Sequence, residues 1–501
     1  MRAKRTAYNS LTELLQNIAL IVTGLILPRL ILYHFGSDYY GVMGSITQFL
    51  GYISLLTAGV GGVTIASLYK PLAEQDVVKI SGIVRATEIF MRKVALIFVG
   101  ILFAVATLFP LLLMDNFDWL FVFSLTLILG IGTSIQFFFG LTYRLLLIAD
   151  QRRYIFALVQ TFTIILNTGI AAILIFTGHE LRIVMLASAA VFAINPLFLF
   201  LYVRKRYNID HAIPPDNTAI KQRWDAFAHQ IASFVNTNAP ILIMTVFTNI
   251  WEVAVFVVYF LILRKIIIFV KSLSGSGIGA AFGNMLANGE HETIRRGLRL
   301  YEFTSNMLAT IIISCTAVLI VPFIAVYTSG IDDVNYYRPL FAVLACIAVF
   351  FDITRIPYQS IVDAAGHFRQ TRTAAFIEIG INITVSVLLV QWFGLVGVVM
   401  GMLCSLIFRT IFFAIYVSKH LVVRSMWFFM RRMLVSVFTI VIIVAIASMF
   451  PGMTALTYFA WILHALPVFG VAVGVTALSI LLFYREEARM LWAKVRSMVK
   501  G

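Results

Sequence analysis

Three cations lie inside one long apolar stretch of the sequence. Residues 251–284 read WEVAVFVVYFLILRKIIIFVKSLSGSGIGAAFGN, and no acid separates Arg264, Lys265 and Lys271. A helix rises about 1.5 Å per residue, so Arg264 lies roughly 16 Å beyond Val253, near the middle of a hydrocarbon core about 30 Å thick. A cation at that depth is costly unless it faces protein, water or an anion. The stretch therefore predicts either a buried ion pair or a position that binds an anion.

The elements that position these cations follow from the composition. The chain has 501 residues, of which 61% are hydrophobic and 12% charged, whereas soluble proteins carry about twice that charged fraction. Apolar stretches of about 20 residues, long enough to cross a bilayer, recur from end to end. We predict an all-α integral membrane protein with about fourteen transmembrane helices. The predicted spans are residues 9–33, 39–66, 94–113, 119–147, 154–177, 183–203, 226–248, 253–284, 303–327, 339–362, 373–392, 395–418, 433–450 and 457–483.

The basic residues predict the orientation of the chain. An even number of spans places both termini on the same side of the membrane. Loops on that side and the two tails hold 29 Lys and Arg, whereas the opposite loops hold only Arg182 and Arg338. By the positive-inside rule both termini are cytoplasmic. The basic residues that remain lie within the spans, and they are Arg29, Arg144, Arg264, Lys265, Lys271, Arg355 and Arg409.

Several features of the sequence recur at a nearly constant interval. Pro240 repeats Pro28, Asn382 repeats Asn167, and the small-residue runs AGVGG and SGSGIGAA are separated by a closely similar distance along the chain. The interval predicts two six-helix pseudo-repeats of the same topology, followed by two extra helices. The predicted divisions are residues 1–206 for an N-terminal lobe, 207–224 for a cytoplasmic linker, 225–420 for a C-terminal lobe, 421–484 for extra helices 13 and 14, and 485–501 for a cytoplasmic tail.

The first two helices of each repeat are predicted to line a central cavity between the lobes. Arg29 would lie near its outer mouth, and the three cations of residues 251–284 would extend from the centre inward. A cationic, water-filled cavity attracts anions, and arginine binds phosphate through two parallel hydrogen bonds. Neutral groups that could bind sugar hydroxyls are Asn17, Gln48, Asn236 and Asn238, although hydrogen bonds between helices would explain them equally well.

Acidic residues are rare within the predicted spans. Asp352 and Arg355 lie three residues apart on one helix, where they can neutralise each other. Glu378 is then the better candidate for binding a coupling ion, but it could equally pair with Arg409. No nucleotide-binding glycine loop, metal-ligand cluster or catalytic triad is recognisable. We therefore expect no catalytic residues, metal or cofactor, and no enzymatic activity.

Two phrases of the sequence resemble a known transporter family. They are NSLTELLQNIALIVTGLILPRLILYHFGSDYYGVMGSITQFLGYISLLTAGVGG near the N-terminus and DAAGHFRQTRTAAFIEIGINITVSVLLVQWFGLVGVVMG in the second repeat. Both are similar to Wzx-type polysaccharide flippases, which form the polysaccharide transporter branch of the MOP exporter superfamily. The resemblance covers the first twelve predicted spans and depends on diffuse patterns.

The resemblance implies a flippase that moves undecaprenyl-diphosphate-linked oligosaccharide from the inner to the outer leaflet of a bacterial inner membrane. Such proteins bind the headgroup in a cationic cavity and use an ion gradient or the membrane potential for alternating access. The positions on the matching helices are Arg29, Arg264, Lys265 and Lys271. The expected partners are the lipid-linked oligosaccharide, membrane lipids, a proton or sodium ion, and the polymerase and glycosyltransferases of the same glycan, with no nucleic acid.

Other functions were weighed against this one. A multidrug antiporter of the same superfamily would move cations and should have an acidic cavity, whereas this one is predicted to be basic. A lipid II-type flippase would use the two uncharged extra helices as a groove for the lipid tail. A major-facilitator transporter would carry a signature that is absent from YKPLAEQDVVKI. A membrane-bound glycan polymerase or ligase would carry a large external loop, but the predicted external segments are short.

Overall fold

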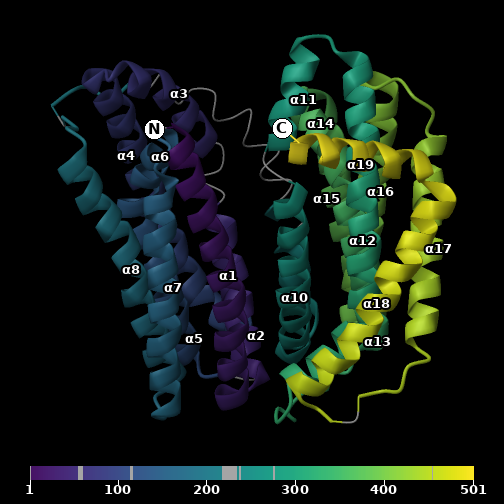
Figure 1. Ribbon diagram of the computed structural model, residues 1–501. Coiled ribbons are helices and arrows are strands. Elements are labelled where there is room, and N and C mark those ends of the chain that lie inside the picture. The colour runs from purple at the N-terminus through teal and green to yellow at the C-terminus, as the bar shows by residue number, and fades with distance from the viewer. Residues whose placement is uncertain are drawn as a thin grey trace. The chain divides into compact units, whose positions relative to one another are not determined.

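The structure is a computed structural model (Figure 1) that describes residues 2–54, 60–112, 117–210, 212–216, 234–235, 238–274, 277–453 and 455–500. Every regular element in these ranges is a helix. Twelve of the described helices are long and apolar enough to cross a membrane. The prediction of an all-α, multi-pass membrane protein is confirmed, but the count of fourteen is not. The two further predicted spans, 39–66 and 226–248, lie partly outside the described residues.

The chain divides into two compact units, Met1–Asn238 and Ala239–Gly501, called unit 1 and unit 2 below. In unit 1, α1 packs along α7, α7 packs on α8, and α5 contacts both α4 and α8. The helices of unit 1 are α1 (Arg2–Phe35), α2 (Ser37–Ser54), α3 (Val60–Glu74), α4 (Val77–Leu108), α5 (Trp119–Ile135), α6 (Leu141–Ala149), α7 (Arg153–Phe176) and α8 (Leu181–Arg206).

Helix α4 begins at Val77, well before the predicted start of its span at residue 94. Its N-cap is Asp76, whose carboxylate accepts a hydrogen bond from the backbone N–H of Lys79 at 3.0 Å. The first part of the helix buries apolar residues such as Ile83 and Val84, but it also carries charged residues. These charges lower the local hydropathy, so a hydropathy criterion detects only the apolar second half of the helix.

Unit 2 is built around α12, which contacts α13, α17 and α18. The predicted span 253–284 is covered by two helical stretches, α10 up to Ser274 and α11 from Gly277, and the two residues between them lie outside the described ones. The final helix, α19, lies across one end of the unit (Figure 1). The helices of unit 2 are α10 (Ile250–Ser274), α11 (Gly277–Ala287), α12 (His291–Tyr327), α13 (Pro339–Thr354), α14 (Ile356–Ala364), α15 (Phe368–Phe393), α16 (Leu395–Tyr416), α17 (Trp427–Ala447), α18 (Tyr458–Phe483) and α19 (Arg485–Lys500).

The approach of α15 to α16 in unit 2 depends on glycine. A Cβ atom placed on Gly401 would lie 2.1 Å from Ser386 Oγ, and one placed on Gly397 would lie 2.3 Å from the carbonyl oxygen of Leu389. Neither distance leaves room for a side chain. Small residues let membrane helices pack through their backbones, where no hydrophobic effect drives them together.

The turns of unit 2 repeat those of unit 1. Helices α6 and α14 are both nine residues long, and they begin at equivalent places in the two repeats. Left-handed backbone conformations, which only glycine adopts without cost, recur at nearly the same interval. The equivalent pairs are Gln75 and Gly289, Gln151 and Gly366, and Gly178 and Gly394. The internal repeat predicted from the sequence is therefore present in the backbone.

Candidate transport site

Helix α10 carries the cations that the sequence singled out, and its burial changes along its length. Between Val253 and Phe260 nearly every side chain is buried, and the helix packs against α12 and α13. The Tyr259 hydroxyl donates a hydrogen bond to the carbonyl oxygen of Tyr336 at 2.9 Å. Further along, Ile268 and Phe269 are 53% and 50% exposed. The first half of α10 thus anchors the helix in unit 2, and the second half leaves one face uncovered.

The predicted cations lie at the transition between these halves. Arg264 and Lys265 are both half-buried, and each interacts with other groups in the protein. The side chain of Lys271, one turn before the end of α10, lies outside the described residues. Two cationic groups are therefore held in partly dehydrated surroundings, where attraction to an anion is stronger than in bulk water.

The predicted polar residues of unit 1 differ in what they contact. Arg29 follows Pro28 within α1 and is half-buried. Asn17 on α1 and Gln48 on α2 are also half-buried, and neither hydrogen-bonds to another described residue. Asn238 is buried and donates its amide to the Phe234 carbonyl oxygen at 2.8 Å. Its side chain therefore stabilises the local backbone. Asn236, the remaining predicted residue, lies outside the described residues.

The four predicted coupling residues form one connected charge network in unit 2. Arg355 lies between α13 and α14, and its guanidinium contacts Asp352 at 2.5 Å and Glu378 at 3.0 Å. The other carboxylate oxygen of Glu378 is 3.4 Å from Nε of Arg409 on α16. The predicted pairing of Asp352 with Arg355 and the alternative pairing of Glu378 with Arg409 are both confirmed. That Arg355 joins the two pairs could not be predicted, because Asp352 already offered it a local partner.

This network balances two acids against two arginines within helices that would cross the membrane. It joins α13, α15 and α16 at the break that Arg355 makes between α13 and α14. A proton or sodium ion bound at Glu378 would have to displace one of its two guanidinium partners. The geometry thus supports a structural role, and any coupling role would require the network to open.

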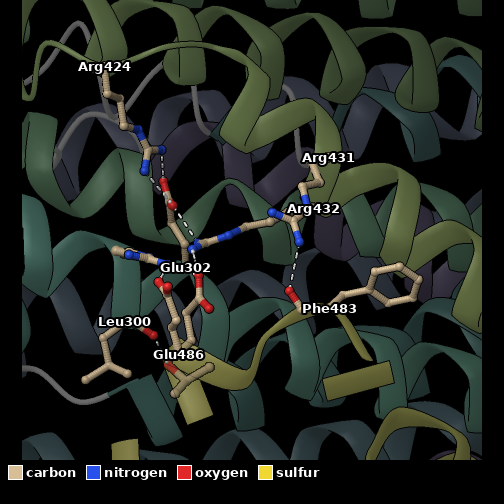
Figure 2. A network of polar contacts seen from close by, with 10 residues as sticks. Leu300, Glu302, Arg424, Arg431, Arg432, Phe483 and Glu486 are labelled. Atoms are coloured by element: carbon tan, nitrogen blue, oxygen red, sulfur yellow. Dashed lines mark hydrogen bonds and ion pairs between the residues drawn. The ribbon is translucent and has the colours of Figure 1, made fainter. Parts of the chain in front are cut away.

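A second charge cluster, which the sequence analysis missed, surrounds Glu302 on α12 (Figure 2). The carboxylate of Glu302 accepts hydrogen bonds from Arg424, which follows α16, and from Arg432 on α17, the latter at 2.6 Å. Arg299, one turn earlier on α12, pairs with Glu486 at 2.7 Å and Glu487 at 2.9 Å, both on α19. These contacts connect α12, α17 and α19.

The centre of this cluster is almost fully buried. The exposed fractions of the side chains are 1% for Glu302, 3% for Arg432 and 5% for Arg424. Although burial alone would lower the pKa of the Arg424 guanidinium, the Glu302 carboxylate outweighs it and raises that pKa above its ordinary value. Nearby, Arg431 donates to the carbonyl oxygen of Phe483 at 2.9 Å (Figure 2). A buried charge pair thus connects α17 to α12, and the contact of Arg431 with Phe483 connects α17 to the end of α18.

One signal in the sequence could have revealed this cluster. Glu302 repeats Glu88, and Tyr358 repeats Tyr143, at the interval that separates the two pseudo-repeats. In unit 1, the Tyr143 hydroxyl donates to Glu88 at 2.6 Å, and in unit 2 Tyr358 lies beside Glu302. A glutamate and a tyrosine that recur together in this way indicate a contact that both repeats share.

Comparison with known proteins identifies the fold. No family model matches the sequence, and no curated protein matches it either. The lipid II flippase MurJ in its inward closed conformation matches with a TM-score of 0.70 and 14% identity, over 95% of this chain and 99% of that one. An inward-facing multidrug resistance MATE family transporter of the MOP superfamily matches with a TM-score of 0.61 and 14% identity, over 81% of this chain and 95% of that one. The chain has the fold of the MOP-superfamily transporters.

A third neighbour agrees with this assignment. The Vibrio cholerae MATE transporter VcmN matches with a TM-score of 0.59 and 17% identity, over 85% of this chain and 98% of that one. The MOP superfamily fold inferred from the two sequence phrases is therefore confirmed. The polysaccharide flippase branch remains a prediction.

The Glu302 cluster gives the first testable prediction. Glu302→Ala would leave Arg424 and Arg432 buried without their carboxylate, and removing one partner of a buried pair costs about 3–5 kcal/mol. We expect a large loss of thermal stability for the protein purified in detergent. The matched control is Glu292→Ala on the same helix, since Glu292 pairs with Arg296 at 3.0 Å in an exposed position and should contribute little. Equal melting temperatures for the two variants would contradict a structural role.

The Glu378 network gives a second prediction. Glu378→Gln leaves Arg409 without its acid, and a hydrogen bond to a charged group contributes about 1.5–3 kcal/mol. Adding Arg409→Met removes the uncompensated cation, so we expect the double variant to be more stable than Glu378→Gln alone. Thermal unfolding of the two single variants and the double variant measures this coupling. Additive losses would show that the two residues act independently.

Proposed function

We propose that this chain is a flippase that moves undecaprenyl-diphosphate-linked oligosaccharide from the cytoplasmic to the outer leaflet of a bacterial inner membrane by alternating access. Both termini would be cytoplasmic, in agreement with the distribution of Lys and Arg. The activity is transport and involves no covalent chemistry. The observation that carries the proposal is the extent of the match to a lipid flippase.

The match to MurJ includes most of the C-terminal helices. The similarity to MurJ covers 95% of the chain, which leaves only a small part of it unmatched. Helices α17 to α19 span residues 427–500, so most of them must be included. The MATE structures cover 81% and 85% of the chain, which does not require these helices. The fuller match to a lipid flippase favours a lipid substrate.

The charge of α10 supports an anionic headgroup. A carrier of cationic drugs needs acidic groups in its site, whereas Arg264, Lys265 and Lys271 are cations on one helix. Arginine forms two parallel hydrogen bonds with a phosphate, so a diphosphate could bind Arg264 and Lys271 together. Asn17 and Gln48 would offer amide groups to sugar hydroxyls. Arg29 remains a predicted contact near the outer end.

The cycle requires two states with different affinities for the substrate. A ligand shifts a conformational equilibrium only by the difference between its affinities for the two states. Transporters with two repeats alternate access by moving one repeat against the other. A proton, a sodium ion or the membrane potential would supply the free energy, and Glu378 is the proposed group for ion coupling. Such coupling would require the contact of Glu378 with Arg355 or Arg409 to break.

A lipid II-type flippase is the second candidate. The MurJ match, with a TM-score of 0.70, exceeds both MATE matches, and lipid II also carries a diphosphate. The two candidates differ in the genetic background that they would rescue. Rescue of a strain that lacks its lipid II flippase would favour the second candidate, and restored surface polysaccharide in a strain that lacks its Wzx-type flippase would favour the first.

The cations of α10 give a third prediction. We expect Arg264→Ala and Lys271→Ala each to abolish surface glycan export, because the diphosphate would lose a cationic contact at membrane depth. Arg264→Lys should retain part of the activity, since it keeps the charge without the fork of donors. Export is measured by immunoblotting of surface glycan in a strain that lacks its own flippase.

The control for this experiment is Arg296→Ala, because Arg296 is exposed and pairs with Glu292 on the adjacent turn of the same helix. It should export glycan at the level of the unmodified protein. Membrane insertion and protein level must be equal in all variants. Normal export by a variant carrying both Arg264→Ala and Lys271→Ala would refute the assigned site.

A further inference from the structure

A cavity of about 730 Å³ lies within unit 1, between α4, α6, α8 and the residues after α8. Its lining includes the apolar and aromatic residues Ile89 and Phe200 together with several arginines. Its charged lining residues are Arg85, Arg92, Arg204 and Glu88. Glu88 is buried and already accepts a hydrogen bond from Tyr143. The lining therefore combines an excess of positive charge with an apolar wall.

The arginines of this cavity differ in how they are held. Arg85 donates to the carbonyl oxygen of Ile213 at 2.8 Å, so it is held by the chain after α8. Arg92 and Arg204 form no ion pair with any acid in the part of the chain that the structure describes. The guanidinium of Arg204 lies 5.9 Å from the centre of the Phe200 ring. These two cations are exposed to solvent and can receive an anion.

The position of the cavity along α4 corresponds to the headgroup layer of a membrane. Helix α4 has 32 residues, or roughly 48 Å at about 1.5 Å per residue, whereas the hydrocarbon core is about 30 Å thick. No charged residue occurs from Val94 to Leu112, so this stretch would fill the core. Arg85 and Arg92 then lie beyond it, and α8 ends nearby with Arg204, Lys205 and Arg206. Lipid phosphates are found at this depth.

The internal repeat relates this cavity to an equivalent corner of unit 2, whose side-chain partners are known. Arg85 of α4 corresponds to Arg299 of α12, and Glu88 corresponds to Glu302. The distance along the chain is the same from Arg85 to Arg299 as from Glu88 to Glu302. In unit 2 protein side chains occupy this corner (Figure 2). Arg432 forms an ion pair with Glu302, and the carboxylates of Glu486 and Glu487 form ion pairs with Arg299. Arg299 of this framework thus binds anionic groups in unit 2, and α19 supplies them, whereas α17 supplies a cation to Glu302.

Unit 1 differs from unit 2 at this corner in two of its residues. Arg92 of α4 occupies the position of Asn306 in α12, and Arg204 of α8 occupies the position of Ser418, each at the repeat interval. Unit 1 therefore supplies two cations from its own helices, and both line the cavity.

We propose that this cavity binds the phosphate of an anionic membrane phospholipid. Arg92 and Arg204 would each donate hydrogen bonds to the phosphate oxygens, and the first acyl carbons would lie on Ile89 and Phe200. Basic pockets between helices at the cytoplasmic surface suit anionic headgroups for this reason. Its lining residues are not those of α10, and binding of a headgroup there would hold unit 1 to the inner leaflet.

The test measures binding of phosphatidylglycerol and phosphatidylcholine to the purified full-length protein by native mass spectrometry. We expect the unmodified protein to prefer phosphatidylglycerol. The variant Arg92→Gln, Arg204→Gln should weaken phosphatidylglycerol binding about 10- to 30-fold, since each cation near a lipid surface contributes about 1 kcal/mol. The matched control is Lys93→Gln, Lys205→Gln, which removes the same charge from the adjacent, exposed positions. It should change binding by less than about threefold.

Several outcomes would overturn the proposal. Equal losses in the two double variants would indicate general surface charge, and absence of a preference over phosphatidylcholine would exclude an anionic headgroup site. Displacement of the lipid by millimolar inorganic phosphate would assign the site to free phosphate. Melting temperatures without added lipid must agree among the variants. If the glutamine variant does not fold, Arg92→Lys, Arg204→Lys replaces it, and unchanged binding in that variant would rule out two-donor recognition by arginine.

Discussion

Charged groups inside a membrane protein must be compensated, because the hydrocarbon around them offers no water. In unit 2 this constraint is met by two buried networks. One joins Asp352, Arg355, Glu378 and Arg409 across three helices, and the other surrounds Glu302. Because these charges are compensated internally, they cannot at the same time attract a substrate. The cations of α10 are therefore the more informative ones for function.

The two networks also determine which parts of unit 2 move together. Glu302 connects α12 to α17 through Arg432, and Arg299 connects α12 to α19. Breaking the contact between Glu302 and Arg432 would leave buried charges without their partner, which costs several kcal/mol, whereas Arg299 and Glu486 are more exposed and their pairing contributes less. Helices α12, α17 and α19 should therefore behave as one body. The extra C-terminal helices are thus an integral part of unit 2.

The sequence predicted the all-α fold class, the membrane location and the internal repeat. The first two follow from hydropathy, and the repeat follows from a constant interval between similar residues, so both signals can be read directly from the order of residues. The predicted membrane span within α4 starts at residue 94, because charged residues interrupt the apolar pattern before it, and the helix itself continues back to Val77. The bridging role of Arg355 and the burial of Glu302 depend on contacts between residues 23 to 130 positions apart. The sequence signals the Glu302 cluster only through the recurrence of Glu88 and Tyr143 as Glu302 and Tyr358, and it holds no signal for the bridge that Arg355 makes.

The repeat explains how one framework could acquire two different uses. Both units keep a glutamate on the long helix beside a tyrosine on a nine-residue helix, as Glu88 with Tyr143 and Glu302 with Tyr358. A buried carboxylate of this kind requires donors nearby. In unit 2 the donors come from Arg424 and Arg432, in segments that follow the repeat. Unit 1 engages its glutamate with the tyrosine and places its arginines along the cavity wall. The same buried acid is thus the centre of a closed protein cluster in one repeat and borders an open cationic cavity in the other. Part of the difference arises from the residues at the positions of Asn306 and Ser418, where unit 1 carries Arg92 and Arg204.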